Sequence, residues 1–250
     1  MTTHNTEAMI LQTKDYGESD RVVSFLTRTG GRLNGIAKGA RRSQKRFVHA
    51  FEPGSLVELT YRERRSLAWI EACKLLEPHL GLRVDVERWG YGALISEILL
   101  EMVPEAEPHE ELFYLVKEAF GRMTGDRDPV NVLLLFLIRF LDLTGYLPSL
   151  DGCGACGKPL REGKRWHWDL PRGILTCPVH SSGRSNSLFL DLGTLRLIGR
   201  CRTVPVDKMW RLRILQGKKM AVLRALTGWI QEYIGKDLKS LRLLDQVRAT

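Results

Sequence analysis

Short β-rich segments of apolar and polar residues occupy the N-terminal part of the chain. They span residues 7–14, 20–27, 31–38, 55–62 and 67–76, and glycines punctuate them at positions 17, 30, 31 and 54. Alternation is clearest in the last run, although neither of its faces is cleanly polar. Runs of this length, bounded by glycine, are typical of β-strands. Five strands in about 70 residues, with a longer connection after the third, predict a small closed barrel such as the OB-fold. A five-stranded SH3-like barrel is the alternative.

After Pro78 the apolar residues recur at helical spacing. Residues 112–123 place their apolar side chains on one face of a helix, and residues 89–103 and 130–143 indicate two more helices. Three consecutive helices with short links predict an antiparallel bundle. The same spacing returns over residues 207–234 and predicts a C-terminal helix that packs back onto this bundle.

The predicted fold class is therefore α+β, with an N-terminal OB-fold β-barrel, a central helical bundle with an inserted zinc finger, and C-terminal helices that pack on the bundle. The corresponding domains are residues 1–79 for the nucleic-acid-binding barrel, 80–149 for the bundle, 150–187 for the zinc finger and 188–250 for the C-terminal helical segment.

The cysteines predict the zinc finger. Two pairs of metal ligands, each separated by two residues, form the pattern C-x2-C-x20-C-x2-H, and Trp166, Trp168 and Gly173 between the pairs indicate a β-hairpin. Two turns that each present a pair of ligands suit the tetrahedral coordination of zinc, and four available ligands predict one closed, structural site. His167 or Cys201 could replace the fourth ligand, although their spacing is less suitable. The predicted ligands are Cys153, Cys156, Cys177 and His180.

The charge of the chain indicates a polyanionic partner. The net charge of +9 is uneven: residues 1–79 have 13 Lys/Arg against 9 Asp/Glu, residues 80–150 have 6 against 12, and residues 151–250 have 19 against 8. Basic segments on both sides of an acidic one suit a protein whose ends bind nucleic acid. Because no apolar run reaches the roughly 18 residues of a membrane helix and no secretory signal is visible, we expect a cytoplasmic, nucleoid-associated protein.

A cluster of five basic residues follows the third predicted strand. OB-folds bind oligonucleotides on the face of strands two and three and on the flanking loops, so cations at this position can neutralise phosphates. Phe47 and Phe51 follow the cluster and could stack on bases, but we expect them in the barrel core. The predicted DNA-binding residues are Lys38, Arg41, Arg42, Lys45 and Arg46.

A second basic run lies on the predicted C-terminal helix. It could extend the path of DNA, bind an acidic tail of a partner protein, or be ordinary solvated surface. It comprises Lys208, Arg211, Arg213, Lys218, Lys219 and Arg224.

The sequence shows no motif that carries catalysis. It contains no glycine-rich phosphate loop, no G-x-S-x-G and no H-E-x-x-H. We therefore expect a protein that is not an enzyme. Two rival interpretations remain: a zinc-dependent nuclease or nucleotide-modifying enzyme, which requires an open metal position, and a zinc-containing OB-fold scaffold or RNA-binding protein without annealing activity.

Four motifs resemble the bacterial RecO family of recombination mediators, and the similarity covers the whole chain. They are the segments 13–21 (TKDYGESDR), 38–42 (KGARR), 153–157 (CGACG), and 233–235 (YIG) followed by 239–242 (KSLR). The chain differs from the commoner finger of this family in having His180 in place of a fourth cysteine, a change that zinc accepts.

The resemblance implies a function in DNA repair and homologous recombination. It implies a protein that binds single- and double-stranded DNA, anneals complementary strands, and with RecR helps RecA to load onto strands covered by single-stranded-DNA-binding protein (SSB). It also implies that Lys38, Arg41 and Arg42 belong to the DNA-binding motif, whereas Lys45 and Arg46 follow only from their charge.

Overall fold

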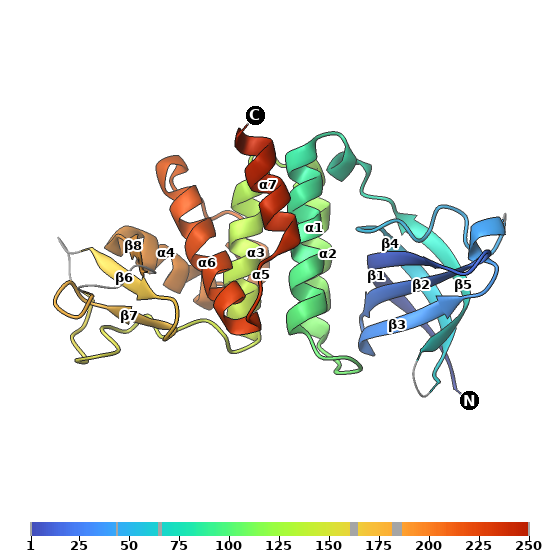
Figure 1. Ribbon diagram of the computed structural model, residues 1–250, viewed down its shortest axis with the longest axis horizontal. Coiled ribbons are helices and arrows are strands. Elements are labelled where there is room, and N and C mark those ends of the chain that lie inside the picture. Colours follow the sequence, from blue (N-terminus) through green and yellow to red (C-terminus); the bar gives the residue numbers. More distant parts are fainter. Residues whose placement is uncertain (1, 44, 65–66, 161–164, 182–186, 250) are drawn as a thin grey trace. The chain divides into compact units, whose positions relative to one another are not determined.

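The computed structural model describes residues 2–43, 45–64, 67–160, 165–181 and 187–249. The chain divides into two compact units, one of Met1–Pro129 with Leu238–Thr250 and one of Val130–Asp237. The first unit holds a barrel and three helices, and the second holds further helices and a small sheet (Figure 1). This is the predicted α+β class, while the predicted domain boundaries stay a prediction.

A closed five-stranded barrel forms the N-terminal part of the first unit, in the order β1-β2-β3-β5-β4. Neighbouring strands are antiparallel except β3 and β5, which run parallel, and β1 closes the barrel by pairing with both β2 and β4. This is the five-stranded barrel of the OB-fold, as predicted. The strands are β1 (Thr3–Tyr16), β2 (Asp20–Thr27), β3 (Gly31–Ala37), β4 (Leu56–Arg62) and β5 (Ala68–Glu77).

The barrel core explains a mixed pattern in the fifth strand. Ile70 and Cys73 are both buried in this core although they are three residues apart, because the pairing of β4 with β5 shifts beside Thr60 and Tyr61. A bulge of this kind changes which side chains point inward, so neither face of the strand is cleanly polar. Phe47 and Phe51 are buried in the same core, as predicted, with ring centroids 5.2 Å apart.

The helices α1 (Val86–Met102), α2 (Glu110–Gly125) and α7 (Lys239–Ala249) complete the first unit. The Asp85 carboxylate caps α1 by accepting from the Arg88 N–H at 2.9 Å. Helix α7 lies against α1, where Gly90 leaves room for Leu244: a Cβ at position 90 would lie 2.4 Å from the leucine side chain. The first two helices agree with the predicted ones, whereas α7 was not predicted.

The barrel is joined to the connection between α1 and α2 by β3. The Arg32 side chain donates to the Val103 carbonyl at 2.6 Å, and the Arg32 carbonyl accepts from the Ala106 N–H at 2.8 Å. Gly31 has φ +72°, and a Cβ there would lie 2.1 Å from the Glu107 carbonyl oxygen. Only glycine fits this approach of two backbone segments.

The second unit is built around α3 (Pro129–Leu143), in which every side chain from Asn131 to Leu141 is buried. Its small sheet has the order β7-β6-β8, and the antiparallel pair β6 and β7 is the predicted hairpin. The other elements are β6 (Trp166–Asp169), β7 (Ile174–Thr176), β8 (Ser187–Leu190), α4 (Leu192–Thr203), α5 (Val206–Met209) and α6 (Lys219–Ile234).

The prediction of one continuous helix over residues 207–234 is wrong. Helix α5 ends at Met209, α6 begins at Lys219, and the residues between them form turns and a short 3₁₀ helix at Gln216–Lys218. The cause is a tertiary contact, because Asn131 of α3 bonds to the backbone of Leu212 and Ile214. The intervening chain therefore follows α3 instead of its own helical hydrogen bonds.

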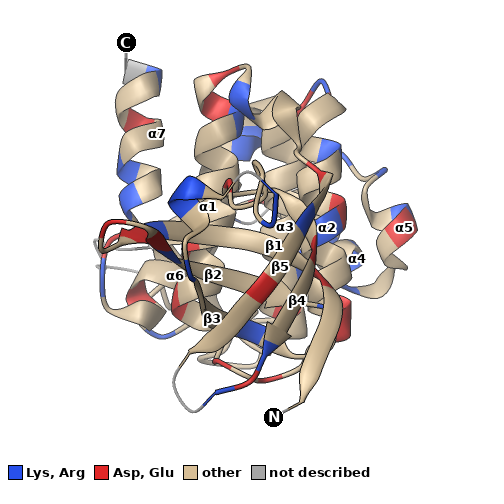
Figure 2. Ribbon diagram, turned by 90° about the vertical axis from the view of Figure 1, so that its right-hand side faces the viewer, with Lys and Arg blue, Asp and Glu red and all other residues tan. Residues whose placement is uncertain are grey.

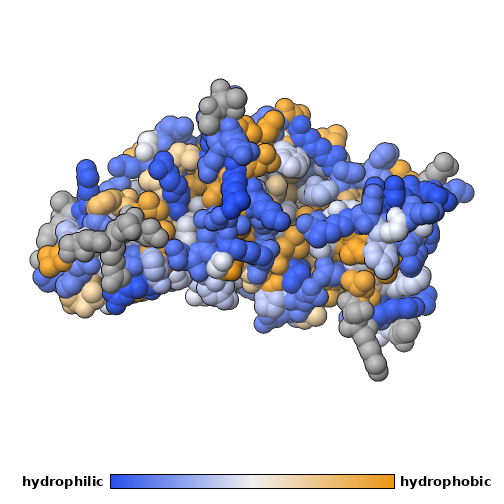
Figure 3. Space-filling model, in the orientation of Figure 1, coloured by the Kyte–Doolittle hydropathy of each residue, from blue (hydrophilic) through white to orange (hydrophobic). Residues whose placement is uncertain are grey.

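The face of the molecule drawn in Figure 3 is mostly hydrophilic, with apolar residues in small separate patches. In the described part of the chain, no helix combines the length and the apolar character needed to cross a membrane.

Candidate metal centre and nucleic-acid interface

Two backbone turns present the four predicted metal ligands. In the first, the Gly157 N–H donates to the Cys153 carbonyl at 2.8 Å, and Gly157 has φ +70°, which favours glycine. The second follows β7, and there the His180 N–H donates to the Cys177 carbonyl at 2.9 Å. The hairpin between the turns brings the two ligand pairs together.

The ligand atoms of Cys153, Cys156, Cys177 and His180 all lie within 4.8 Å of one another. The His180 Nδ1 is 3.3 Å from the Cys177 Sγ and 3.8 Å from the Cys153 Sγ. A tetrahedral zinc site with ordinary bond lengths places such a nitrogen and sulfur about 3.6 Å apart. The group therefore has the spacing of a metal site of this kind and can hold a metal ion.

Two of the three sulfur atoms, those of Cys153 and Cys177, are arranged to carry negative charge. At Cys156 the Lys158 N–H lowers the pKa, but burial and the side chains of Cys153 and Cys177 raise it overall. Burial raises the pKa of Cys153, but N–H groups of Cys177, Ala155 and Cys156 point at its sulfur and bring the pKa down to about 6. Burial also raises the pKa of Cys177, but the His180 ring, together with the N–H groups of His180 and Val179, lowers it overall. A metal binds the thiolate form, so these contacts favour the form that coordinates.

The two alternative ligands lie elsewhere. His167 is buried in β6 with its ring centroid 3.8 Å from that of Phe189. Cys201 is buried on α4 with its Sγ 3.9 Å from the Leu135 carbonyl oxygen, and burial raises the pKa of this thiol to about 12. Among the described residues, neither side chain belongs to the group that can hold a metal.

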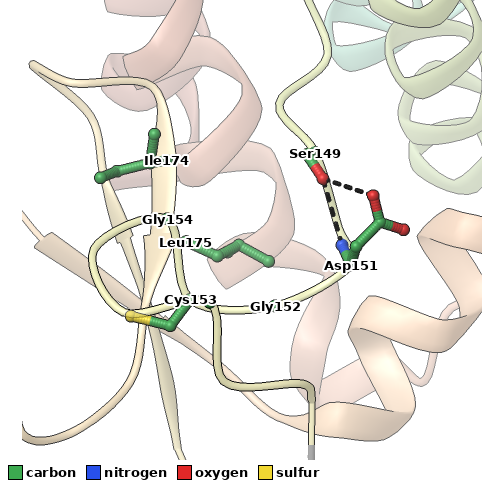
Figure 4. Close-up of a pocket in the computed structure, with 8 residues that line it drawn as sticks. Ser149, Asp151, Gly152, Cys153, Gly154, Ile174 and Leu175 are labelled. Carbon is green, nitrogen blue, oxygen red and sulfur yellow. Dashed lines mark hydrogen bonds between the residues drawn. The ribbon is translucent and has the colours of Figure 1, made fainter.

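A pocket of about 220 Å³ lies beside the first turn (Figure 4). Of the four candidate ligands only Cys153 lines it, so the pocket borders the metal group but is not formed by it. Across it, the Ser149 hydroxyl donates to the Asp151 carboxylate at 2.7 Å and accepts from the Asp151 N–H at 3.3 Å. These bonds hold the chain that enters the finger.

The predicted basic cluster forms a turn after β3, which we call the basic turn; its described residues are 38–43, 45 and 46. Asp20 at the start of β2 fixes it: its Oδ1 accepts from the Gly39 N–H at 2.9 Å, and its Oδ2 lies 2.5 Å from the Lys38 Nζ. The Lys38 ammonium and the Gly39 N–H lower the pKa of Asp20 from 3.8 to about 2. Gly39 has φ +69°, so the sharp bend at this position requires glycine.

The structure divides the five predicted DNA-binding residues into two groups. Lys38 pairs with Asp20, the Arg41 Nε lies 3.5 Å from an Asp15 oxygen, and Arg46 donates to the Lys38 carbonyl at 3.0 Å. These three side chains are tied to the barrel. The other two, Arg42 and Lys45, are exposed and form no ion pair within the described residues.

Two residues at this place were noted in the sequence only as part of the motif 13–21, without a role in binding. Tyr16 ends β1 with 57% of its surface exposed, and the Arg41 side chain bonds to the neighbouring Gly17 carbonyl at 3.3 Å. The Arg21 Nε lies 3.2 Å from Asp15. Figure 2 shows basic and acidic residues together at these strand ends. An exposed aromatic ring beside cations is the combination that binds single strands.

The second predicted basic run does not lie on one helix. Lys208 is on α5, Arg211 and Arg213 follow it, Lys218 is in the 3₁₀ helix, and Lys219 begins α6. Lys219 is only 5% exposed, and its Nζ donates to the Gln216 side chain at 2.6 Å. The run is therefore not a single basic face of a helix.

Comparisons with known proteins agree with the motifs. The family model described as recombination protein O N terminal matches residues 1–79, and that described as recombination protein O C terminal matches residues 83–242. A DNA repair protein RecO of Syntrophobacter fumaroxidans is 54% identical over 250 residues, covering 100% of both chains. That of Syntrophus aciditrophicus is 32% identical over 98% of this chain and 96% of its own. That of Anaeromyxobacter dehalogenans is 30% identical over 96% and 94%. The chain thus belongs to the RecO family of DNA repair proteins.

Proposed function

We propose that this chain is a recombination mediator that binds single- and double-stranded DNA and anneals complementary strands. The observation that carries the proposal is the basic turn, where Arg42 and Lys45 are exposed and form no ion pair among the described residues. Arg41 of the same turn bonds to the carbonyl of Gly17, the residue that follows the exposed Tyr16. Cations contribute affinity for the phosphate backbone, and an aromatic face stacks on any base. Such a surface binds DNA without reading its sequence.

The residues of the basic turn have different roles in this proposal. Arg42 and Lys45 meet phosphates directly, while Lys38, Arg41 and Arg46 hold the turn on the barrel and add to its positive potential. Annealing requires that the charge of two strands be neutralised, and no covalent bond is made or broken. We therefore propose that the protein is not an enzyme.

We propose that the metal is one zinc ion held by Cys153, Cys156, Cys177 and His180. The ligand set and the spacing of the ligand atoms support zinc, and four protein ligands leave no position for a substrate. A zinc ion there supplies cross-links between the two turns and so stabilises the finger. The finger is assigned to residues 150–187, the DNA-binding barrel to residues 1–79, and the helical parts to residues 80–149 and 188–250.

Membership of the RecO family supports the proposed partners. These are single- and double-stranded DNA, RecR and SSB, with RecA acted on indirectly when it is loaded onto SSB-coated strands. The proposed place of action is the cytoplasm, at the nucleoid.

The proposal is tested by annealing of two complementary oligonucleotides that carry a donor and an acceptor fluorophore, with and without SSB. The wild type is compared with a Cys153→Ser/Cys156→Ser variant, and bound metal is measured by mass spectrometry. We expect one zinc per chain and salt-sensitive annealing in the wild type. The variant should lose zinc and melt at a lower temperature, yet anneal below that temperature.

Two results would contradict the proposal. A wild type that binds neither single strands nor duplexes would exclude the mediator function and leave a zinc-containing scaffold. Tight binding of RNA, with DNA failing to compete and no annealing, would point to an RNA-binding protein.

A further inference from the structure

A basic segment of the second unit takes no part in the site described so far. It runs from the last turn of α4 through α5 to the chain that follows, residues 200–214, and we call it the basic strap. Asp207 is its only acidic residue. Its basic residues are Arg200, Arg202, Lys208, Arg211 and Arg213.

Two buried polar side chains of α3 fasten the backbone of the strap. At one end, the Arg139 guanidinium donates to the carbonyls of Arg202 and Val204. At the other end, Asn131 donates to the Leu212 carbonyl at 3.0 Å and accepts from the Ile214 N–H at 2.9 Å. Burying polar groups in an otherwise apolar helix is costly unless their hydrogen bonds are made, and here the strap makes them. The strap is therefore held in one conformation.

Apolar anchors fix which side of the strap faces outward. Met209, Trp210 and Ile214 are at most 4% exposed. On either side of Met209 and Trp210, Lys208 and Arg211 are exposed and belong to one turn, in which the Arg211 N–H donates to the Lys208 carbonyl at 3.1 Å. Like charges three residues apart repel each other. This repulsion is relieved when a polyanion binds.

Most of this charge is not neutralised by the protein. Arg202 pairs with Asp142 at 2.7 Å, but Arg200, Lys208 and Arg211 form no ion pair within the described residues. The strap thus presents a rigid set of unneutralised cations, the arrangement that gains most from binding regularly spaced phosphates.

The chemistry of the strap favours a phosphate backbone as its ligand. Trp210 is its only aromatic residue and is 4% exposed, so the strap offers no platform on which bases could stack. In this it differs from the basic turn, where the Tyr16 ring is exposed. An acidic peptide tail would need an apolar pocket beside the cations for specific binding, and the apolar anchors Met209, Trp210 and Ile214 are buried.

We propose that the basic strap is a second DNA-binding site, which takes the phosphate backbone of a strand or duplex. The proposal rests on the function proposed above and deepens it, because one chain then has separate sites for two strands on its two units. It also accounts for annealing by a single protein, since each strand is neutralised by its own surface.

The test compares two variants of the full chain that lose the same charge. Lys208→Gln/Arg211→Gln removes two exposed cations from the strap, and Lys158→Gln/Arg172→Gln removes two exposed cations from the finger of the same unit. Binding of a labelled single strand and of a duplex is measured by fluorescence anisotropy over a range of salt concentrations. Annealing is measured with the fluorophore pair, and melting temperatures are recorded for each protein.

We expect the strap variant to have a shallower salt dependence for duplex DNA, by about 1.8 in the slope of log K against log salt, for two lost phosphate contacts. Its annealing rate should fall several-fold, while its melting temperature stays near that of the wild type. The finger variant should keep the salt slope, annealing rate and melting temperature of the wild type. Unchanged duplex slope and annealing in the strap variant would overturn the strap proposal, with the mediator function intact. Binding of a labelled polyglutamate peptide is measured in the same way. If the strap variant loses binding to this peptide but keeps its DNA binding, the proposal is overturned in favour of an acidic protein partner. A wild type that binds no DNA would overturn both proposals.

Discussion

Replacing Asp20 by asparagine should make the protein bind DNA more tightly. The Asp20 carboxylate holds the Lys38 ammonium at 2.5 Å and so occupies a cation of the basic turn. The asparagine side chain keeps an oxygen that can accept the Gly39 N–H, now bonded at 2.9 Å to Asp20 Oδ1, but it has no charge for Lys38. The turn therefore keeps its bend, and Lys38 becomes available to a phosphate.

The size of the gain follows from the release of counterions. One further phosphate contact steepens the salt dependence of single-strand binding by about 0.7 in the slope of log K against log salt. Relative to 1 M salt, that slope amounts to about 8-fold tighter binding at roughly 0.05 M and about 3-fold at roughly 0.2 M. The gain should thus shrink as salt is added.

Glu18 provides the matched control, because Glu18→Gln changes the net charge by the same amount and lies two residues before Asp20 in the chain. Glu18 is exposed and forms no ion pair among the described residues. Its replacement alters only the long-range field, which salt screens beyond about 10 Å at 0.1 M. Anisotropy titrations of both variants decide the matter. Weaker binding by the Asp20→Asn variant, or an equal steepening in the control, would refute the reasoning.

Lowering the pH does not release Lys38 from Asp20 in the way that the Asp20→Asn mutation does. Asp20 has a folded-state pKa of about 2, below the ordinary value of 3.8, so its carboxylate stays charged in any buffer used for binding. A depressed pKa means that its contribution to stability is fully present above pH 3.8 and is lost as the pH falls through about 2. Lowering the pH from 8 to 5 should therefore leave the Lys38 pair intact.

Three further changes have expected outcomes. Arg42→Ala/Lys45→Ala should make the single-strand salt slope shallower by about 1.4 without lowering the melting temperature, and an unchanged slope in titrations would remove these residues from the interface. Cys177→Ser should reduce bound metal well below one equivalent and lower the melting temperature; metal analysis that still finds one equivalent would contradict the proposed ligand set. Gly31→Ala should cost more than about 2 kcal/mol of unfolding free energy in urea titrations, because φ is +72° and the new methyl group meets the Glu107 carbonyl; a near-neutral result would mean that the two segments can separate.

The barrel and the finger could be predicted because their signals are local. Short β-rich runs and glycine turns mark the strands of the barrel, and the paired spacing of the ligands marks the finger without knowledge of the rest of the chain. The sequence of the fifth strand even carried a trace of its bulge. Its apolar side chains change sides near Glu71, where β4 and β5 shift in register.

The last helix could not be predicted because its beginning is fixed by another helix. The Glu97 carboxylate of α1 accepts the N–H groups of Lys239 and Ser240, each at 2.9 Å, and so caps α7. A capping residue in the preceding sequence is the usual signal for a helix start, and here the cap comes from a residue 142 positions away. The same limit applies to residues 207–234, where the bonds from Asn131 override a helical pattern.

The sequence also could not predict which basic residues are exposed without an ion pair, and this distinction leads to a measurable difference. The basic turn and the basic strap together have ten Lys and Arg residues. Five of them are exposed and form no ion pair among the described residues: Arg42, Lys45, Arg200, Lys208 and Arg211.

The salt dependence of DNA binding by the wild-type protein measures how many of these cations contact phosphates. If all ten contacted one strand or two, the slope of log K against log salt would be about −7 in total, whereas the five unpaired cations give about −3.5. A titration in which a single-strand complex approaches the steeper value would mean that the Lys38–Asp20 pair and its counterparts open when DNA binds. A value near −3.5 would mean that the ion pairs and hydrogen bonds that hold each basic segment persist in the complex, and that the protein binds DNA with a surface it already holds in place.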